Sequence, residues 1–261
     1  LLLTAGALVG SEGWAWGQVQ ADASLIVDIR LPRTLGACLA GALLGLAGAL
    51  AQGLFRNPLA DPYLLGSASG ASLGVAIGMV MLSQLDVSPW FVRMGITGMA
   101  FMGAWLAVAL SLVLSWGVQH TLRLLLAGVV VGVVLGALTQ MVLLFSPDSL
   151  QAMQAFMLGS TSFVGWTSFV LMGSVWLVCV ALAWLLARVL DGLSLGDATA
   201  RSLGLPLGPM RAALVGVLAL ATGTAVAQTG LIAFIGLVAP HLVRSLVNTT
   251  SGRMMWLASG T

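Results

Sequence analysis

The chain has 261 residues, of which 59% are hydrophobic and 7% are charged, and its formal net charge is +2. This apolar content exceeds what one soluble core can bury, and it predicts an integral membrane protein. The charge is too small for a nucleic-acid surface, and because all ten basic residues are arginine, the chain has no lysine for a phosphate-binding P-loop.

Six apolar runs are long enough to cross a hydrocarbon core of about 30 Å, at residues 35–55, 64–82, 94–118, 124–145, 166–190 and 212–227. A seventh run, 231–243, predicts a short or broken helix, whose free backbone groups must be satisfied by protein or water. The first ten and last eight residues predict the end of one further helix and the start of another. We therefore expect an all-α polytopic membrane protein with about nine helices and truncated termini.

The segment RNPLADPYLLGSASGA, residues 56–71, interrupts the first two runs. Pro58 and Pro62 forbid a continuous helix and bias Asn57 and Asp61 away from the α region. The segment therefore predicts a turn at the membrane boundary, in which Asn57 caps free backbone groups. Two interpretations remain open: a plain turn, or a gate in which Asn57 and Leu59 close a pathway.

Arginine placement in the short loops predicts the orientation of the helices. If residue 56 lies inside the cell, seven arginines lie inside, and only Arg30, Arg33 and Arg93 lie outside. The inner loop 191–211 contains a predicted short helix with Asp197 as its N-cap and Gly204 as its stop. On the outer side, residues 148–160 are amphipathic at helical spacing and predict a helix along the membrane surface.

Two runs carry glycine at every fourth residue, which lets helix backbones approach closely. These glycines serve either ordinary packing or a surface on which helices slide; they are Gly66, Gly70, Gly74 and Gly78 in one run, and Gly128, Gly132 and Gly136 in the other.

Four segments in chain order resemble the permease subunits of ABC importers for vitamin B12, haem and ferric siderophores: RLPRTLGACLAGALLGLAGALAQGLFRNPLADPYLLGSASGASLG, RLLLAGVVVG, GDATARSLG and TGLIAFIGLVAPHLVR. The resemblance implies a single permease domain over residues 1–261 with the ten-helix type II importer fold, multi-pass in the bacterial inner membrane. The implied partners are a second permease copy in a homodimer, two ATPase subunits and a periplasmic binding protein. The resemblance implies no cofactor in this chain, with ATP and magnesium bound by the ATPase subunits.

The same resemblance implies roles for individual residues. Arg30 and Arg33 would dock the binding protein through its acidic residues, the alternative being an anchor to lipid head groups. The implied cytoplasmic gates are formed by Asn57 and Leu59, and by Thr121 and Leu122. The residues implied to couple to the ATPase are Asp197, Ala200, Arg201, Leu203 and Gly204.

The sequence offers no residue pattern for metal binding or catalysis. Cys38 and Cys179 fall in apolar runs, and with His120 and His241 they match no metal or catalytic spacing. We therefore expect a transporter and not an enzyme, moving a bulky metal chelate by alternating access. The alternative is an ion-coupled secondary transporter or channel, which usually needs a buried ionisable group near the bilayer midplane; none of the six runs has an acidic residue or histidine at its centre.

Overall fold

The computed structural model describes residues 9–10, 13–14, 26–82, 88–115, 121–194, 196–202, 206–246 and 258. Within these residues five helices are long and apolar enough to cross a membrane, so the chain is a multi-pass membrane protein. They are α3 (Leu31–Phe55, which follows the π-helix η1, Ile26–Arg30), α5 (Pro89–Leu114), α6 (Thr121–Leu144), α8 (Trp166–Leu185) and α11 (Leu207–Thr229). Each corresponds to one of the predicted runs.

The prediction of one continuous span at 64–82 is wrong. Gly66, with a φ of 82° in the left-handed region that glycine tolerates, separates the 3-10 helix η2 (Pro62–Leu65) from α4 (Ser67–Leu82). The 16 residues of α4 extend over about 24 Å, which is less than a hydrocarbon core of about 30 Å.

Two other predicted boundaries also differ. The run 166–190 is divided after Leu185, and a separate helix α9 (Ala187–Ser194) follows. Residues 9 and 10, expected at the end of a helix, form strand β1 (Val9–Gly10), which pairs antiparallel with β2 (Gly13–Trp14). Glycine destabilises a helix interior by about 1 kcal/mol relative to alanine, so Gly10 disfavours the expected helix.

Three shorter helices lie where the sequence suggested them. They are α7 (Leu150–Leu158), preceded by the 3-10 helix η3 (Pro147–Ser149), α10 (Asp197–Ser202) in the loop 191–211, and α12 (Ile235–Leu246) in the seventh run. Leu203 and Gly204 lie outside the described residues. The chain enters α12, a helix of 12 residues, through the non-helical residues 230–234, so the short helix is the alternative found.

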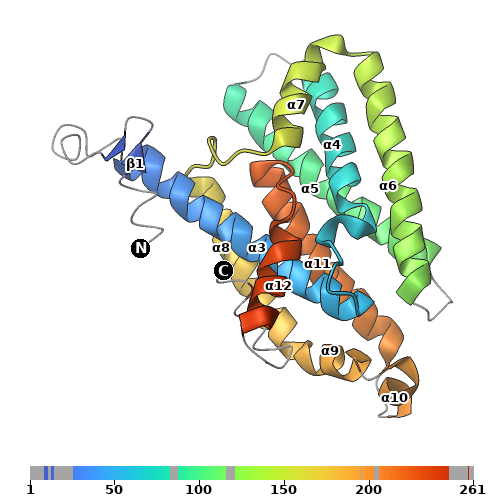
Figure 1. Ribbon diagram of the computed structural model, residues 1–261. Helices are drawn as coiled ribbons and strands as arrows, with labels where there is room; N and C mark the ends of the chain where they lie inside the picture. The colour runs from blue at the N-terminus through green and yellow to red at the C-terminus, as the bar shows by residue number, and fades with distance from the viewer. Residues whose placement is uncertain are drawn as a thin grey trace.

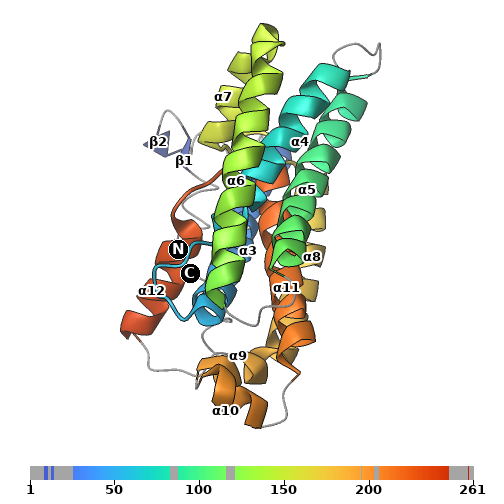
Figure 2. The same ribbon diagram turned by 90° about the vertical axis from the view of Figure 1, so that its right-hand side faces the viewer.

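The helices form two groups with α11 between them (Figure 1). In one group, α4 packs against α5 and α6; in the other, α3 packs against α8, α9 and α12; α11 contacts α3, α4, α5 and α8. Most of α3 and α11 is buried, whereas less than a third of the apolar window of α5, α6 and α8 is buried. Helices α9 and α10 lie together beyond one end of the bundle (Figure 2), and we call this the α9–α10 end.

Glycine permits the closest contact between helices in the first group. A Cβ atom at Gly74 would overlap the carbonyl oxygen of Met99 on α5, and one at Gly70 would overlap that of Gly103. Gly128 of α6 lies equally close to the carbonyl oxygen of Leu64, whereas Gly136 faces open space. The predicted glycine stripes therefore include both tightly packed positions and a free one.

We expect Gly74→Ala to lower the melting temperature of the detergent-solubilised protein, because the added methyl group must push α4 away from the α5 backbone. Overpacking of this kind destabilises by about 1–3 kcal/mol. The same substitution at Gly136 meets no atom, so Gly136→Ala should leave the melting temperature unchanged or raise it slightly. Equal effects at the two positions would contradict the packing described here.

Candidate functional site

The turn at 56–61 is organised by main-chain bonds and by Asn57. Arg56 ends α3 at a φ of 49°, and the amide of Asn57 donates to the carbonyl of Gln52 at 3.2 Å. The Asn57 side-chain oxygen accepts from the amide of Leu59 at 2.9 Å, and its carbonyl accepts from Ala60 at 3.0 Å. Asn57 therefore caps the turn with its own side chain, which leaves Leu59 at the tip.

Asp61 begins the next element of this stretch. Its carboxylate accepts from the Tyr63 amide at 2.7 Å and so caps η2. Burial raises the pKa of the Asp61 carboxyl, and the hydrogen bond from the Tyr63 amide opposes that rise. The side chain of Tyr63 points elsewhere, because its hydroxyl donates to the carbonyl of Ile232 at 3.1 Å.

The second candidate gate pair stands at the start of α6. Thr121 is the first residue of that helix, and the side chain of Leu122 is 74% exposed, while Leu59 is 65% exposed. The two segments are connected through η2, whose Leu64 carbonyl lies against Gly128 of α6. Two exposed leucines supply apolar groups that can fill a narrow gap, and this role needs no catalytic chemistry.

The candidate coupling residues lie at the α9–α10 end. Asp197, Ala200 and Arg201 belong to α10, and the amide of Ala200 donates to the carbonyl of Gly196 at 2.9 Å. Ala200 is fully buried within this chain, so it holds α10 in place and does not itself present a contact surface. Helix α9 reaches α3, since a Cβ atom at Gly53 would lie 2.9 Å from a methyl carbon of Leu190.

The candidate docking arginines lie at the opposite end of α3. Arg30 ends η1 and is half-buried, whereas Arg33, one turn later, is exposed. Residues three apart share a helix face, so both can meet one partner. The third arginine at this end is used internally, because Arg93 donates to the carbonyl of Phe163 in the turn before α8.

Two polar residues that the sequence analysis did not single out belong to this site. Gln52 is only 2% exposed, and its side-chain amide donates to the carbonyl of Leu237 in α12 at 3.0 Å. Tyr63 reaches the same part of the chain through Ile232. An uncharged polar side chain inside an apolar span was the signal that could have identified Gln52.

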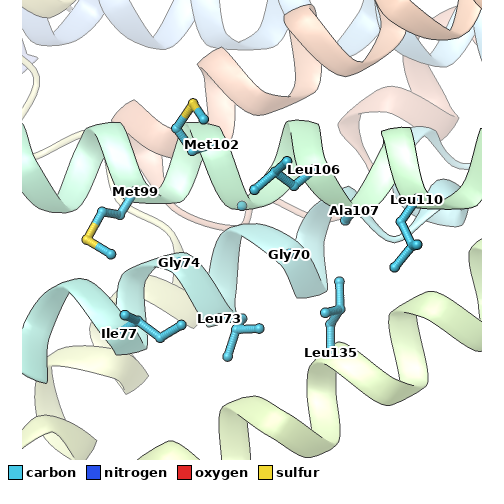
Figure 3. A pocket seen from close by; sticks show the side chains of 11 residues that line it. Gly70, Leu73, Gly74, Ile77, Met99, Met102, Leu106, Ala107, Leu110 and Leu135 are labelled. Atoms are coloured by element: carbon cyan, nitrogen blue, oxygen red, sulfur yellow. The ribbon is translucent and has the colours of Figure 1, made fainter.

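An apolar cavity of about 280 Å³ lies between α4, α5 and α6 (Figure 3). Its lining is hydrocarbon, thioether and glycine, including Leu73, Met102 and Leu135. Small-molecule sites usually add a few polar groups that fix the ligand, and the described lining offers no polar side chain of this kind. Among the described residues, no group of three histidine, cysteine or acidic side chains is placed to hold a metal ion.

Comparison with known proteins identifies similarity along the whole chain. Residues 1–260 match the family model described as the FecCD transport family. The chain is 40% identical over 232 residues to the ferric enterobactin transport system permease protein FepD of Escherichia coli (strain K12), covering 87% of this chain and 67% of that protein. It is 36% identical over 259 residues to the hemin transport system permease protein HmuU of Yersinia pestis, covering 98% and 76%.

Further similarity comes from a third relative and a solved structure. The vitamin B12 import system permease protein BtuC of Salmonella typhi is 38% identical over 266 residues, covering 98% of this chain and 77% of that protein. A metal-chelate type ABC transporter solved in an inward-facing conformation superposes with a TM-score of 0.86 at 26% identity, covering 99% of this chain and 83% of that chain. The described helices thus have the fold of an ABC importer permease.

We expect Leu59→Ala to leave the protein assembled but leaky, because Leu59 is exposed in the single chain and its loss opens no cavity in the core. Efflux of a small trapped dye from proteoliposomes measures the leak. Leu144→Ala is the matched control, since Leu144 is 76% exposed at the other end of α6. Equal efflux from both variants and the unmodified protein would assign the stretch to a plain turn.

Proposed function

The chain belongs to the FecCD transport family and is a permease subunit of an ABC importer, and from this we propose that it carries a bulky metal chelate across the bacterial inner membrane by alternating access. The match of residues 1–260 to the family carries the proposal. Its relatives are permeases for ferric enterobactin, haemin and vitamin B12, so the cargo class is a ferric siderophore, haem or cobalamin. Family membership favours this function over the ion-coupled alternative.

The proposed assembly contains two permeases, two ATPase subunits and a periplasmic binding protein. The chain has no lysine and hence no P-loop, so ATP and magnesium would be bound by the ATPase subunits. Exposed apolar side chains along α6, among them Leu126, Val130 and Val133, suit contact with the second permease or with lipid. The cytoplasm would then lie at the α9–α10 end of the bundle.

Coupling to ATP hydrolysis would occur through α10. It is a short helix beyond the bundle, and α9 connects it to the end of α3 next to the turn at 56–61. Asp197, Arg201, Leu203 and Gly204 would meet the ATPase, and Ala200 would anchor the helix. Movement of α9 and α10 would then reach the gate residues Asn57 and Leu59 through packed elements.

Uptake into proteoliposomes that contain the whole importer tests this function. With binding protein outside and ATP and magnesium inside, one of ferric enterobactin, haem and vitamin B12 should accumulate at least tenfold above the ATP-free level. Arg201→Glu should abolish accumulation and weaken co-purification of the ATPase while the permease still folds. Arg188→Glu reverses an exposed arginine on α9 and serves as the control. Accumulation of none of the three, or accumulation without ATP, would refute the proposal.

Docking of the binding protein should depend on Arg30 and Arg33. Exposed charges are screened beyond about 10 Å at 0.1 M salt, so the affinity should fall as salt rises. Reversing both arginines to glutamate should weaken binding at least tenfold in surface plasmon resonance, and arginines introduced on the binding protein should restore part of it. Unchanged affinity of the double variant would favour the lipid-anchor alternative.

A further inference from the structure

The chain enters α12 through a segment that is not helical. Residues 230–234 are not helical, and Phe234 has a φ of 69°, a left-handed conformation that is unusual for an aromatic residue. The amide of Gly230 still donates to Val226 of α11 at 2.8 Å, and the carbonyl of Phe234 accepts from the amide of Val238 at 2.8 Å. Between them the amide of Leu231 donates to the carbonyl of Phe156 in α7 at 3.1 Å, and the carbonyl of Ile232 needs a donor from another part of the protein.

Two side chains of the α3–η2 region supply such partners. The Tyr63 hydroxyl donates to the carbonyl of Ile232, and the Gln52 amide donates to the carbonyl of Leu237. We call these four residues the clasp. Pro240 lies inside α12 and has no amide hydrogen for the carbonyl four residues before it, so the helix is weakened next to the clasp.

The backbones also meet closely at this point. A Cβ atom at Gly48 would overlap the carbonyl oxygen of Gly236, which is the carbonyl that Pro240 leaves without a helical donor. A Cβ atom at Gly236 would in turn collide with the ring of Pro62. The start of α12 is therefore held between α3 and the residue that begins η2.

Each side-chain donor of the clasp is also tied to the turn at 56–61. The carbonyl of Gln52 accepts from the Asn57 amide at 3.2 Å, while its side chain holds Leu237. The amide of Tyr63 donates to Asp61, while its hydroxyl holds Ile232. Both residues thus bind the turn through the main chain, and through the side chain they bind α12 or the segment that leads into it.

We propose that Gln52 and Tyr63 are positioning residues for transport, which make the start of α12 and the turn at 56–61 move as one body. The Gln52 side-chain oxygen has no hydrogen-bond partner in the described protein, although an unsatisfied buried acceptor is unfavourable. The interaction of the Gln52 side chain with α12 therefore depends on its amide donor. The inference rests on the proposed function, since it assigns these residues to the movement of the gate.

Isosteric variants of the complete importer test the effect on transport. Tyr63→Phe removes only the hydroxyl, and Gln52→Met keeps similar length without the donor. Each should lower the amount of chelate taken up per ATP hydrolysed about three- to tenfold. The double variant should lower it by less than the product of the two single reductions, because both residues act on one body. The probes are ferric enterobactin, haem and vitamin B12 as above.

The control is Thr222→Val, which removes a buried hydroxyl that donates to the carbonyl of Leu218 within α11 at 2.8 Å and joins no separate elements. It should leave uptake per ATP unchanged. The proposal would be overturned if all complexes assemble and Tyr63→Phe and Gln52→Met take up as much chelate per ATP hydrolysed as Thr222→Val.

A second measurement needs no chelate, so its outcome is independent of the transport proposal. Tyr63 is the only tyrosine of the chain, and 3-fluorotyrosine placed there reports on its hydroxyl by fluorine NMR. In the assembled importer one hydrogen-bonded signal should persist in the nucleotide-free and ATP-trapped states, and Gln52→Met should shift or split it. The proposal would be overturned if, in the labelled complex without the Gln52 substitution, the fluorine signal takes the chemical shift of a solvent-exposed fluorotyrosine in either state.

Discussion

Inside a bilayer every backbone amide and carbonyl must find a partner within the protein, and this requirement applies to α12 and to the segment before it. The non-helical entrance of α12 and its internal Pro240 remove helical hydrogen bonds. Partners come from three other elements: the carbonyl of Phe156, the hydroxyl of Tyr63 and the amide of Gln52. Gln52 of α3 bonds to α12 itself, whereas Tyr63 of η2 and Phe156 of α7 bond to the non-helical segment that leads into it.

These hydrogen bonds can form only if the backbones of neighbouring elements come close, and glycine allows that approach. Gly48 brings α3 against α12, and Gly128 brings α6 against η2. In lipid such contacts gain dispersion energy without a hydrophobic driving force between helices. Close packing of this kind has few intermediate arrangements, so the helices that it joins move as units and do not deform smoothly.

Local patterns predicted the long helices well because apolar length alone decides whether a segment spans a membrane. They failed where one residue changes the backbone, as at Gly66, whose positive φ shortens α4. The turn at 56–61 was predicted from Pro58 and Pro62, and Asn57 caps it as expected. The bonds from Gln52 and Tyr63 were beyond sequence reasoning, since they join residues 185 and 169 positions apart.

The few charged residues of the long helices bear on how force would reach the proposed gate. The charged residues of the five long helices, such as Arg33 and Arg123, lie near helix starts. The centres of these helices therefore contain no charged residue that could take part in a charge relay. In the proposed assembly, energy from the ATPase subunits would then arrive by movement of packed elements. A contiguous route exists from α10 through α9 to Leu190 and Gly53, and Gly53 is adjacent to Gln52. The residue that receives α9 is therefore next to the one that holds both the turn and α12.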